Sequence, residues 1–120
     1  MEKIILASNS PRRREILGEF IDFEIITREI NEIKDDNFSP WATVMGLAFG
    51  KGIEVAKENE NSIVLSADTL VELDGKLMGK PKNRDEAREM IKSLSGKVHN
   101  VYTAYAIFKL SQGIKIGRAS

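Results

Sequence analysis

The sequence predicts a single α/β domain, and three observations support this prediction. Short apolar segments typical of buried strands alternate along the chain with segments whose apolar residues recur at helical spacing. A serine followed by a proline, the signature of a helix start, occurs twice. The chain has 120 residues, of which 42% are apolar and 30% charged, so it can bury one substantial core. No repeat, low-complexity segment or linker divides residues 1–120, which we expect to form one domain.

The N-terminal part predicts a strand followed at once by a helix. Residues 3–8 are mostly apolar and typical of a short buried strand. Ser10 stands where a helix N-cap belongs and Pro11 at the first helical position. A helix is therefore expected from Pro11 to about Leu17, ended by Gly18.

A second strand and a longer helix follow. Residues 22–27 alternate loosely between apolar and polar, and residues 28–39 form a polar, acidic loop without a clear period. The pair Ser39-Pro40 opens a helix that runs to about Asn59. Lys51 lies on the apolar face of this helix, a poor position for a side chain that seeks water. The other members of that face include Trp41, Val44, Met45, Leu47, Ala48, Val55 and Ala56.

The second half predicts two long strands and a helix between them. Residues 63–73 read as one strand, or as two with a break near Asp68, and Asp74-Gly75 is a hairpin turn signal. Residues 98–110 are rich in β-branched and aromatic residues, as in a long strand. The turn Ser111-Gln112-Gly113 leads from it into a last strand over residues 114–116.

The helix between these strands carries its own start and stop signals. Asn83 followed by Glu86 resembles a capping box, and Ser95-Gly96 marks the end. One face of the helix is apolar and consists of Ala87, Met90, Ile91 and Leu94.

Composition excludes several classes of function. The net charge is +0, so no overall basic field favours nucleic acid or an acidic membrane, and no apolar run approaches the ~20 residues of a membrane span. The absence of cysteine excludes disulfides and thiolate chemistry and fits a cytoplasmic protein. His99 is the single histidine, so a multi-histidine zinc site is excluded. Any metal would be held mainly by oxygen atoms, which favours Mg²⁺ or Mn²⁺.

The most informative segment is the first helix start, where Arg12, Arg13 and Arg14 follow Ser10 and Pro11. Cations at the positive end of a helix dipole are unfavourable, by roughly 0.3–1 kcal/mol each. Their presence is explained if a multiply charged anion binds there, held by backbone N–H groups and guanidinium groups. The alternative is a capped helix with a solvated basic turn.

Four other residues could carry chemistry. Asp68 ends the apolar run 63–68, and open α/β sheets bind ligands at strand carboxyl ends, although a turn carboxylate is the alternative. Glu32 lies in the acidic loop and Lys80 follows a glycine; either could equally be a solvated surface residue. His99 is interpreted as a strand hydrogen-bonding residue rather than a catalyst. Together, cations and acids of this kind suit phosphoanhydride hydrolysis, in which cations hold the phosphates and acids hold a metal and activate water.

Five ordered blocks of the chain resemble the Maf-like nucleoside triphosphate pyrophosphatases. They are Leu6-Ala7-Ser8-Asn9-Ser10-Pro11-Arg12-Arg13, Leu47-Ala48 with Lys51, Ala67-Asp68-Thr69-Leu70-Val71, Gly79-Lys80-Pro81, and Leu94-Ser95-Gly96-Lys97-Val98-His99-Asn100-Val101-Tyr102-Thr103. The resemblance implies a mixed, twisted sheet with flanking helices, in two lobes around a nucleotide cleft, as in inosine triphosphatases. It also implies a cytoplasmic enzyme, usually a homodimer, that uses a divalent metal.

Roles follow from the resemblance position by position. Ser8, Ser10, Arg12, Arg13, Lys51 and Lys80 would contact the substrate, and Glu32 and Asp68 would hold metal and activate water, with Asp68 the better candidate for the base. The last block resembles the branch that hydrolyses dTTP and UTP to the monophosphate and pyrophosphate. Two other functions remain open: 7-methyl-GTP pyrophosphatase, and a non-catalytic nucleotide-binding protein that regulates septum formation.

The chain departs from the family pattern at three positions and in length. Asn31-Glu32 replaces an Asp-Glu pair, Gly52 stands where alanine follows the lysine, and Ala104 stands where glycine follows the threonine. Family members are also longer, so the resemblance implies that this chain lacks their C-terminal third.

Overall fold

The computed structural model describes residues 3–28, 38–73, 76–78, 83–94 and 99–119. Strands and helices alternate through the first half, as the sequence predicts. In chain order the elements are β1 (Ile4–Leu6), α1 (Pro11–Gly18), β2 (Glu24–Ile25), α2 (Pro40–Glu58), β3 (Ile63–Leu73), β4 (Lys76–Met78), α3 (Arg84–Leu94), β5 (His99–Lys109) and β6 (Gly113–Ala119). Across these ranges, no helix is both long enough and apolar enough to cross a membrane.

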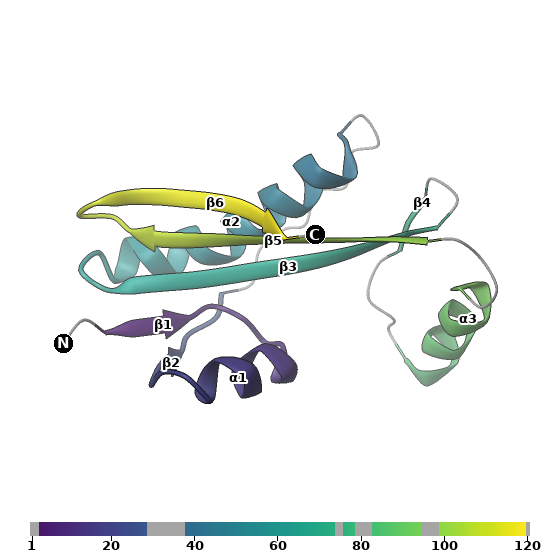
Figure 1. The fold of residues 1–120 in the computed structure, drawn as a ribbon, viewed down its shortest axis with the longest axis horizontal. Coiled ribbons are helices and arrows are strands. Elements are labelled where there is room, and N and C mark those ends of the chain that lie inside the picture. The colour runs from purple at the N-terminus through teal and green to yellow at the C-terminus, as the bar shows by residue number, and fades with distance from the viewer. Residues whose placement is uncertain (1–2, 29–37, 74–75, 79–82, 95–98, 120) are drawn as a thin grey trace.

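The strands form one mixed sheet in the order β2-β1-β3-β5-β6, with β4 also paired to β3 (Figure 1). β1 runs parallel to β2 and to β3, whereas β4, β5 and β6 pair in antiparallel fashion. Strands β3 and β5 are the longest and form the centre of the sheet. The predicted mixed α/β architecture is confirmed.

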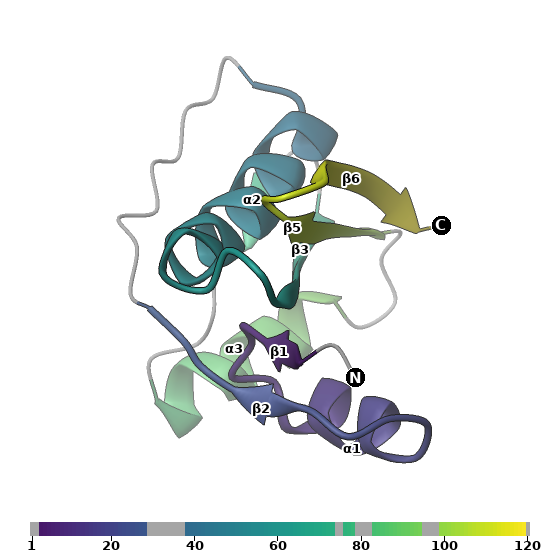
Figure 2. The same ribbon diagram turned by 90° about the vertical axis from the view of Figure 1, so that its left-hand side faces the viewer.

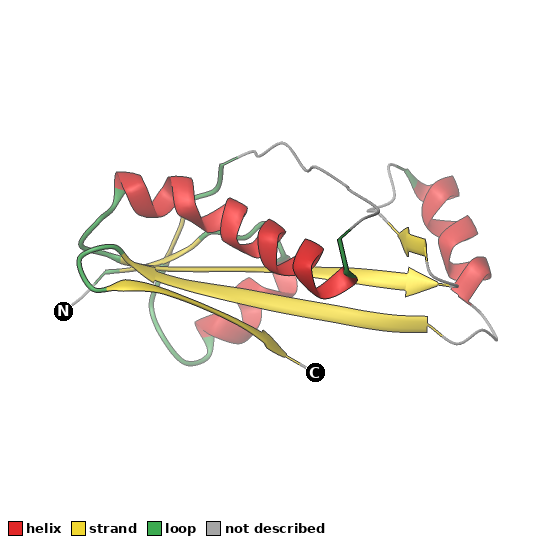
Figure 3. Ribbon diagram, turned by 90° about the horizontal axis from the view of Figure 1, so that it is seen from above, coloured by secondary structure: helices red, strands yellow, loops and turns green. Residues whose placement is uncertain are grey.

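Helix α2 covers one face of the sheet and lies across β3 and β5 (Figure 3). Ser39 caps it by accepting the backbone N–H of Ala42 at 3.1 Å, and Pro40 occupies the first turn, as predicted. Its apolar side packs on alternate residues of the two strands, since successive side chains of a strand point to opposite faces. The buried core of this layer consists of Val44, Leu47, Ala48, Val55, Ala56, Val64, Leu70, Ala104, Ala106 and Phe108.

Helix α1 lies on the side of the sheet away from α2 (Figure 2), and helix α3 lies near the end of β3 that is remote from α1 (Figure 1). Both begin at the predicted caps. Ser10 Oγ accepts the backbone N–H of Arg13 at 3.3 Å, and Asn83 Oδ1 accepts that of Glu86 at 2.8 Å. Local sequence therefore determines where each helix starts.

Two predicted strand lengths and the predicted place of Asp68 need correction, whereas the prediction of a single strand over residues 63–73 is confirmed. The strands predicted over 3–8 and 22–27 are shorter, at Ile4–Leu6 and Glu24–Ile25. The segment 63–73 is one unbroken strand, so Asp68 lies in the middle of β3 and not at its carboxyl end. The reason is that β5 pairs with β3 continuously from Val64 to Leu73, which leaves no position for a break.

One predicted turn lies within the described residues, and the others lie outside them. Gly113 has a φ of +121°, a backbone conformation that side-chain-bearing residues rarely adopt, so the predicted turn after β5 is confirmed. The strand that follows, β6, covers Gly113–Ala119 and is longer than the predicted 114–116, because it pairs with β5 from Lys109 back to Thr103. The Asp74-Gly75 turn and the Ser95-Gly96 helix end lie outside the described residues, as does the loop over residues 29–37. The strands on either side of Asp74-Gly75, β3 and β4, pair in antiparallel fashion.

Gly52 marks the closest approach of α2 to the sheet. A Cβ atom at this position would lie 2.2 Å from Phe108 Cε1 and 2.5 Å from Ser66 Oγ. The Ser66 hydroxyl group donates to the Ala48 carbonyl at 2.6 Å, which fixes the helix against β3. The family's alanine therefore has no room in this chain, because Phe108 and Ser66 fill the space.

We expect Gly52→Ala to destabilise the protein. The overpacking costs about 1–3 kcal/mol, which exceeds the gain of up to about 1 kcal/mol that alanine brings to a helix interior. Urea unfolding measures the difference. Gly46→Ala, in the same helix with nothing within 4 Å of the added Cβ, is the matched control and should be neutral or stabilising. A Gly52→Ala variant as stable as Gly46→Ala would contradict this packing.

Candidate active site

An open stretch of the β3 edge forms the centre of the candidate site. On one side β3 pairs with β5 along its length, whereas on the other it pairs with β1 up to Leu65 and with β4 from Val71 onward. Between these points, residues 66–70 have no ladder partner on this edge among the described residues. The open stretch begins where β1 ends. The site thus lies at a strand carboxyl end, but that of β1 and not that of β3.

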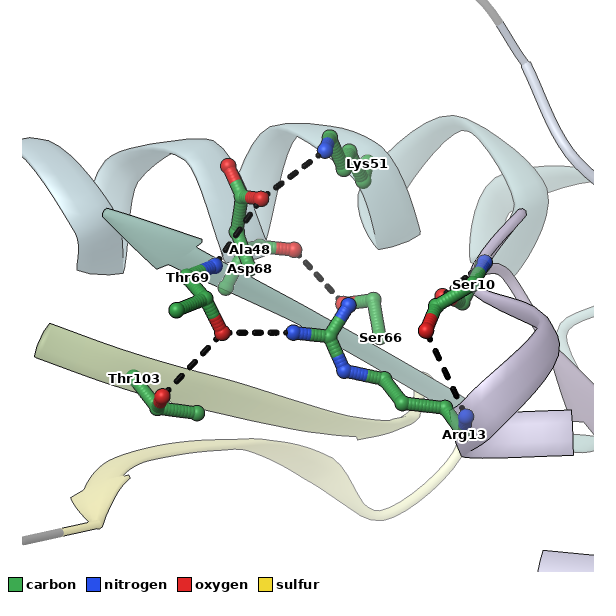
Figure 4. A network of polar contacts seen from close by, with 9 residues as sticks. Ser10, Arg13, Ala48, Lys51, Ser66, Asp68, Thr69 and Thr103 are labelled. Carbon is green, nitrogen blue, oxygen red and sulfur yellow. Dashed lines mark hydrogen bonds and ion pairs between the residues drawn. The ribbon is translucent and has the colours of Figure 1, made fainter. Parts of the chain in front are cut away.

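Asp68 and Lys51 form an ion pair at this edge, on the α2 side of the sheet (Figure 4). Lys51 Nζ lies 3.1 Å from Asp68 Oδ1, and the two side chains are only 19% and 8% exposed. The same Oδ1 atom accepts the backbone N–H of Thr69 at 3.0 Å. Asp68 makes no other hydrogen bond or ion pair within the described part of the chain, so its Oδ2 atom has no polar partner there. The unusual position of Lys51 on an apolar helix face is explained by this pairing.

The loop from Ser8 to Ser10 lies just beyond β1 and is held in a fixed shape. Ser8 is buried, and its Oγ atom accepts the N–H of Ser10 at 3.2 Å. Arg14 donates from Nε and Nη2 to the Ser8 carbonyl, each at 3.3 Å, and from Nη2 to Asn9 Oδ1 at 3.2 Å. The third arginine of the basic turn therefore stabilises the loop itself.

The other two arginines of the turn point elsewhere. Arg13 reaches from α1 to the middle of the sheet, where its Nη2 atom donates to Thr69 Oγ1 at 2.7 Å (Figure 4). Arg12 is exposed and makes no hydrogen bond or ion pair within the described ranges. Successive helix positions differ by about 100°, which gives the three arginines three separate directions.

The site spans both faces of the sheet around the open edge. Asp68 and Thr69 are neighbours in β3, so their side chains point to opposite faces. Asp68 faces Lys51 of α2, and Thr69 faces Arg13 of α1. The helix start with its basic turn and the paired carboxylate thus approach each other across one edge, which gives an anion-binding group and a carboxylate in the same region.

The sequence identified most of these residues. Ser8, Ser10, Arg13, Lys51 and Asp68 all contact one another or a shared neighbour in the site, and Arg12 lies in the same turn. Glu32 and Lys80 lie outside the described residues, as does the side chain of His99. Among the described residues, no group of three or more histidine, aspartate or glutamate side chains lies close enough together to hold a metal ion.

Two contributors were missed by sequence reasoning. The sequence does not distinguish Arg14 from the two arginines before it, although Arg14 holds the Ser8 loop. The sequence alone indicates no role for Thr69, although its Oγ1 atom accepts a hydrogen bond from Arg13. Its position beside Asp68 in the Ala67–Val71 block was the available signal.

The fold of this chain is also found in solved structures of other proteins. It is similar to the Ham1 protein of Staphylococcus aureus, with a TM-score of 0.62 at 16% identity over 98% of this chain and 68% of that one. It is also similar to a nucleoside-triphosphatase / dITP/XTP pyrophosphatase of Mycobacterium abscessus, with a TM-score of 0.55 at 14% identity over 98% and 70%. The chain therefore has the fold of this group of proteins.

The family follows from the sequence itself. The model of the Maf-like protein family matches residues 3–119, and the chain belongs to this family. It is 51% identical over 114 residues to a dTTP/UTP pyrophosphatase of Fusobacterium nucleatum, covering 94% of this chain and 59% of the relative. It is 44% identical over 119 residues to a dTTP/UTP pyrophosphatase of Pyrococcus furiosus, covering 97% and 63%. The chain thus spans about three fifths of the length of these relatives.

Proposed function

We propose that this chain binds and hydrolyses nucleoside triphosphates, taking dTTP and UTP to the monophosphate and pyrophosphate. The observation that carries the proposal is the Asp68 carboxylate, which Lys51 and the Thr69 N–H hold through one oxygen, while the other has no hydrogen-bond partner among the described residues. It lies at the same sheet edge as the basic helix start. The identity of about half of the residues with dTTP/UTP pyrophosphatases supports the substrate class.

The proposed reaction is an in-line displacement at the α-phosphorus. A water molecule attacks, its oxygen forms the new bond to the α-phosphorus, and the bond to the oxygen that bridges to the β-phosphorus breaks. The Asp68 carboxylate accepts the proton through Oδ2. Arg12 and Arg13, with Lys51 and Lys80, neutralise the charge on the phosphates as pyrophosphate leaves. Ser8 and Ser10 fix the loop beneath the phosphates.

A divalent cation fits the residues available. Carboxylate oxygens are the ligands that Mg²⁺ and Mn²⁺ prefer, and Asp68 Oδ2 has no competing partner in the described part of the chain. Glu32 would hold the ion when Asp68 is the base, and Asp68 would hold it when Glu32 is the base, with the nucleotide's own phosphates as further ligands. When bound, such an ion neutralises phosphate charge and lowers the pKa of a bound water.

A triphosphate panel tests the proposal. Purified protein is incubated with dTTP, UTP, dCTP, GTP and 7-methyl-GTP in the presence of Mg²⁺ or Mn²⁺, and the products are separated by ion-exchange chromatography. The proposal predicts pyrophosphate as the first product, with dTTP and UTP preferred. Orthophosphate as the first product, or a preference for 7-methyl-GTP, would reject it. Binding without turnover would favour the non-catalytic alternative, in which the chain senses nucleotides.

Arg13→Ala should weaken triphosphate binding by about 10- to 150-fold. The substitution removes a charge-assisted contact worth roughly 1.5–3 kcal/mol, and the change is read as a dissociation constant by titration calorimetry. The matched control is Arg28→Ala, because Arg28 is an exposed arginine that pairs with Glu58 away from the site. Equal losses in the two variants would point to a general charge effect and against a specific role of Arg13.

The nucleoside triphosphate is the proposed partner, and neither nucleic acid nor a membrane takes part. A homodimer and a cytoplasmic location, which the family resemblance implies, complete the proposal.

A further inference from the structure

We propose that Thr103, in β5, is a positioning residue for triphosphate binding: its hydroxyl group holds that of Thr69 where Thr69 accepts the Arg13 guanidinium. This inference rests on the proposed function, because it takes Arg13 as a phosphate ligand. It adds a residue that touches neither the phosphates nor the reacting atoms.

The three side chains form a continuous chain of hydrogen bonds (Figure 4). Arg13 Nη2 lies 2.7 Å from Thr69 Oγ1, and Thr69 Oγ1 lies 3.1 Å from Thr103 Oγ1. These hydrogen bonds connect α1 to β3 and β3 to β5. Residues 13, 69 and 103 therefore meet at one point on the sheet face away from α2. No other contact of either threonine hydroxyl occurs among the described residues.

The register of the sheet explains why the two threonines meet. Thr69 and Thr103 are directly opposite in the antiparallel pair. The Leu65 carbonyl points toward β1, where it accepts the N–H of Ala7. The backbone groups of Ala67 and Thr69 point the same way, because the direction alternates along a strand, so Thr69 makes no backbone hydrogen bond to β5. Thr69 and Thr103 are therefore a non-hydrogen-bonded pair, in which the two side chains lie closer together than in a hydrogen-bonded pair.

The number of hydrogen atoms available determines which groups donate and which accept in this network. A guanidinium group donates and cannot accept, so Thr69 Oγ1 is the acceptor toward Arg13. The two hydroxyl groups have two hydrogen atoms, and their mutual hydrogen bond uses one. The other is left to donate, beside the remaining N–H groups of Arg13. Thr69 therefore holds Arg13 through one N–H group, and the remaining N–H groups of the guanidinium can donate to the acceptor oxygens of a phosphate chain.

Preorganisation is the physical basis of the expected effect. An arginine side chain loses rotamer freedom when it binds, at a cost of the order of 0.5–1.5 kcal/mol, and the threonine pair limits this loss in advance. Thr103→Val keeps the shape and strand preference of the residue but removes its hydroxyl group, whereas Thr103→Ser keeps the hydroxyl group.

The test measures binding of UTP and of inorganic tripolyphosphate to the 120-residue chain by titration calorimetry with Mg²⁺ present. We expect Thr103→Val to weaken both by about three- to tenfold, and Thr103→Ser to stay within about twofold of the wild type. Tripolyphosphate lacks the base and sugar, so a loss shared by both ligands assigns the effect to phosphate binding. In turnover, KM should rise with little change in kcat.

Two controls separate positioning from a structural effect. Thr43→Val makes the same chemical change in α2, where the buried Thr43 hydroxyl has no hydrogen-bond partner within the described ranges, and it should leave binding unchanged. In an Arg13→Ala background, Thr103→Val should cause no further loss, since its effect passes through Arg13. If the valine variant does not fold, Thr103→Ala replaces it in both measurements.

The outcomes are distinct. If the wild type binds both ligands and Thr103→Val binds them equally well, this inference is overturned and the proposed function is left intact. The inference would also be overturned if Thr103→Val weakened binding as much in the Arg13→Ala background as it does in the wild type. Absence of UTP and tripolyphosphate binding by the wild type would overturn the proposed function and this inference with it.

Discussion

Asp68→Asn is expected to lower turnover of UTP by about 10²–10⁴-fold while leaving nucleotide binding largely intact. The amide retains an oxygen that can accept from Lys51 Nζ and from the Thr69 N–H, so the local geometry survives. What disappears is the negative charge and basicity of Oδ2. The rate is measured per folded molecule, and binding is measured in parallel by calorimetry.

Glu72→Gln provides the matched control for this prediction. Glu72 lies four residues further along β3 and points to the same face, where it accepts hydrogen bonds from Asn100 and Tyr102. The same change from carboxylate to amide there should leave turnover unaffected. If Asp68 only stabilises the strand, Asp68→Asn would lower Tm and spare the specific activity of the folded fraction. Glu32 would then become the candidate base.

Phe108→Ala should destabilise the protein by about 3–5 kcal/mol, enough to lower Tm by about 10–20 °C. Phe108 is 0% exposed and packs among Val55, Val64 and Ala106, with the Phe49 ring centroid 5.7 Å from its own. Truncation removes the ring and leaves a cavity beneath Gly52, where α2 and the sheet are closest. Urea unfolding with a linear extrapolation gives the free energy.

The control for this prediction is Phe38→Ala, at a side chain that is 58% exposed. We expect a change within about 0.5 kcal/mol there, as at other surface positions. A similar small change for Phe108→Ala would mean that the α2 layer is not packed as described. Lys51 would then lack the fixed support that directs it to Asp68.

The elements that could be predicted from sequence depend on local signals. The starts of α1, α2 and α3 were all found because Ser10, Ser39 and Asn83 satisfy backbone N–H groups within three residues. The long strands were found because their β-branched and aromatic content is itself local. The apolar side of α2 was found for the same reason, because its period lies within one helix.

What could not be predicted depends on distant pairing. The unbroken course of β3 results from its ladder with β5, whose paired residues lie 26 to 44 positions apart in sequence. The position of Asp68 within that strand, and the open edge beside it, follow from where β1 ends. Likewise, Arg13 and Arg14 look alike in sequence. Their roles differ because one faces β3 and the other faces the Ser8 loop.

The most direct test of the central claim is to follow hydrolysis of UTP in ¹⁸O-labelled water with Mg²⁺ and to locate the label by ³¹P NMR. Attack of water at the α-phosphorus, with the nucleotide held by Arg13 and the proton accepted at Asp68, predicts one ¹⁸O atom in uridine monophosphate and none in pyrophosphate. Label in pyrophosphate, or formation of uridine diphosphate and labelled orthophosphate, would contradict the account.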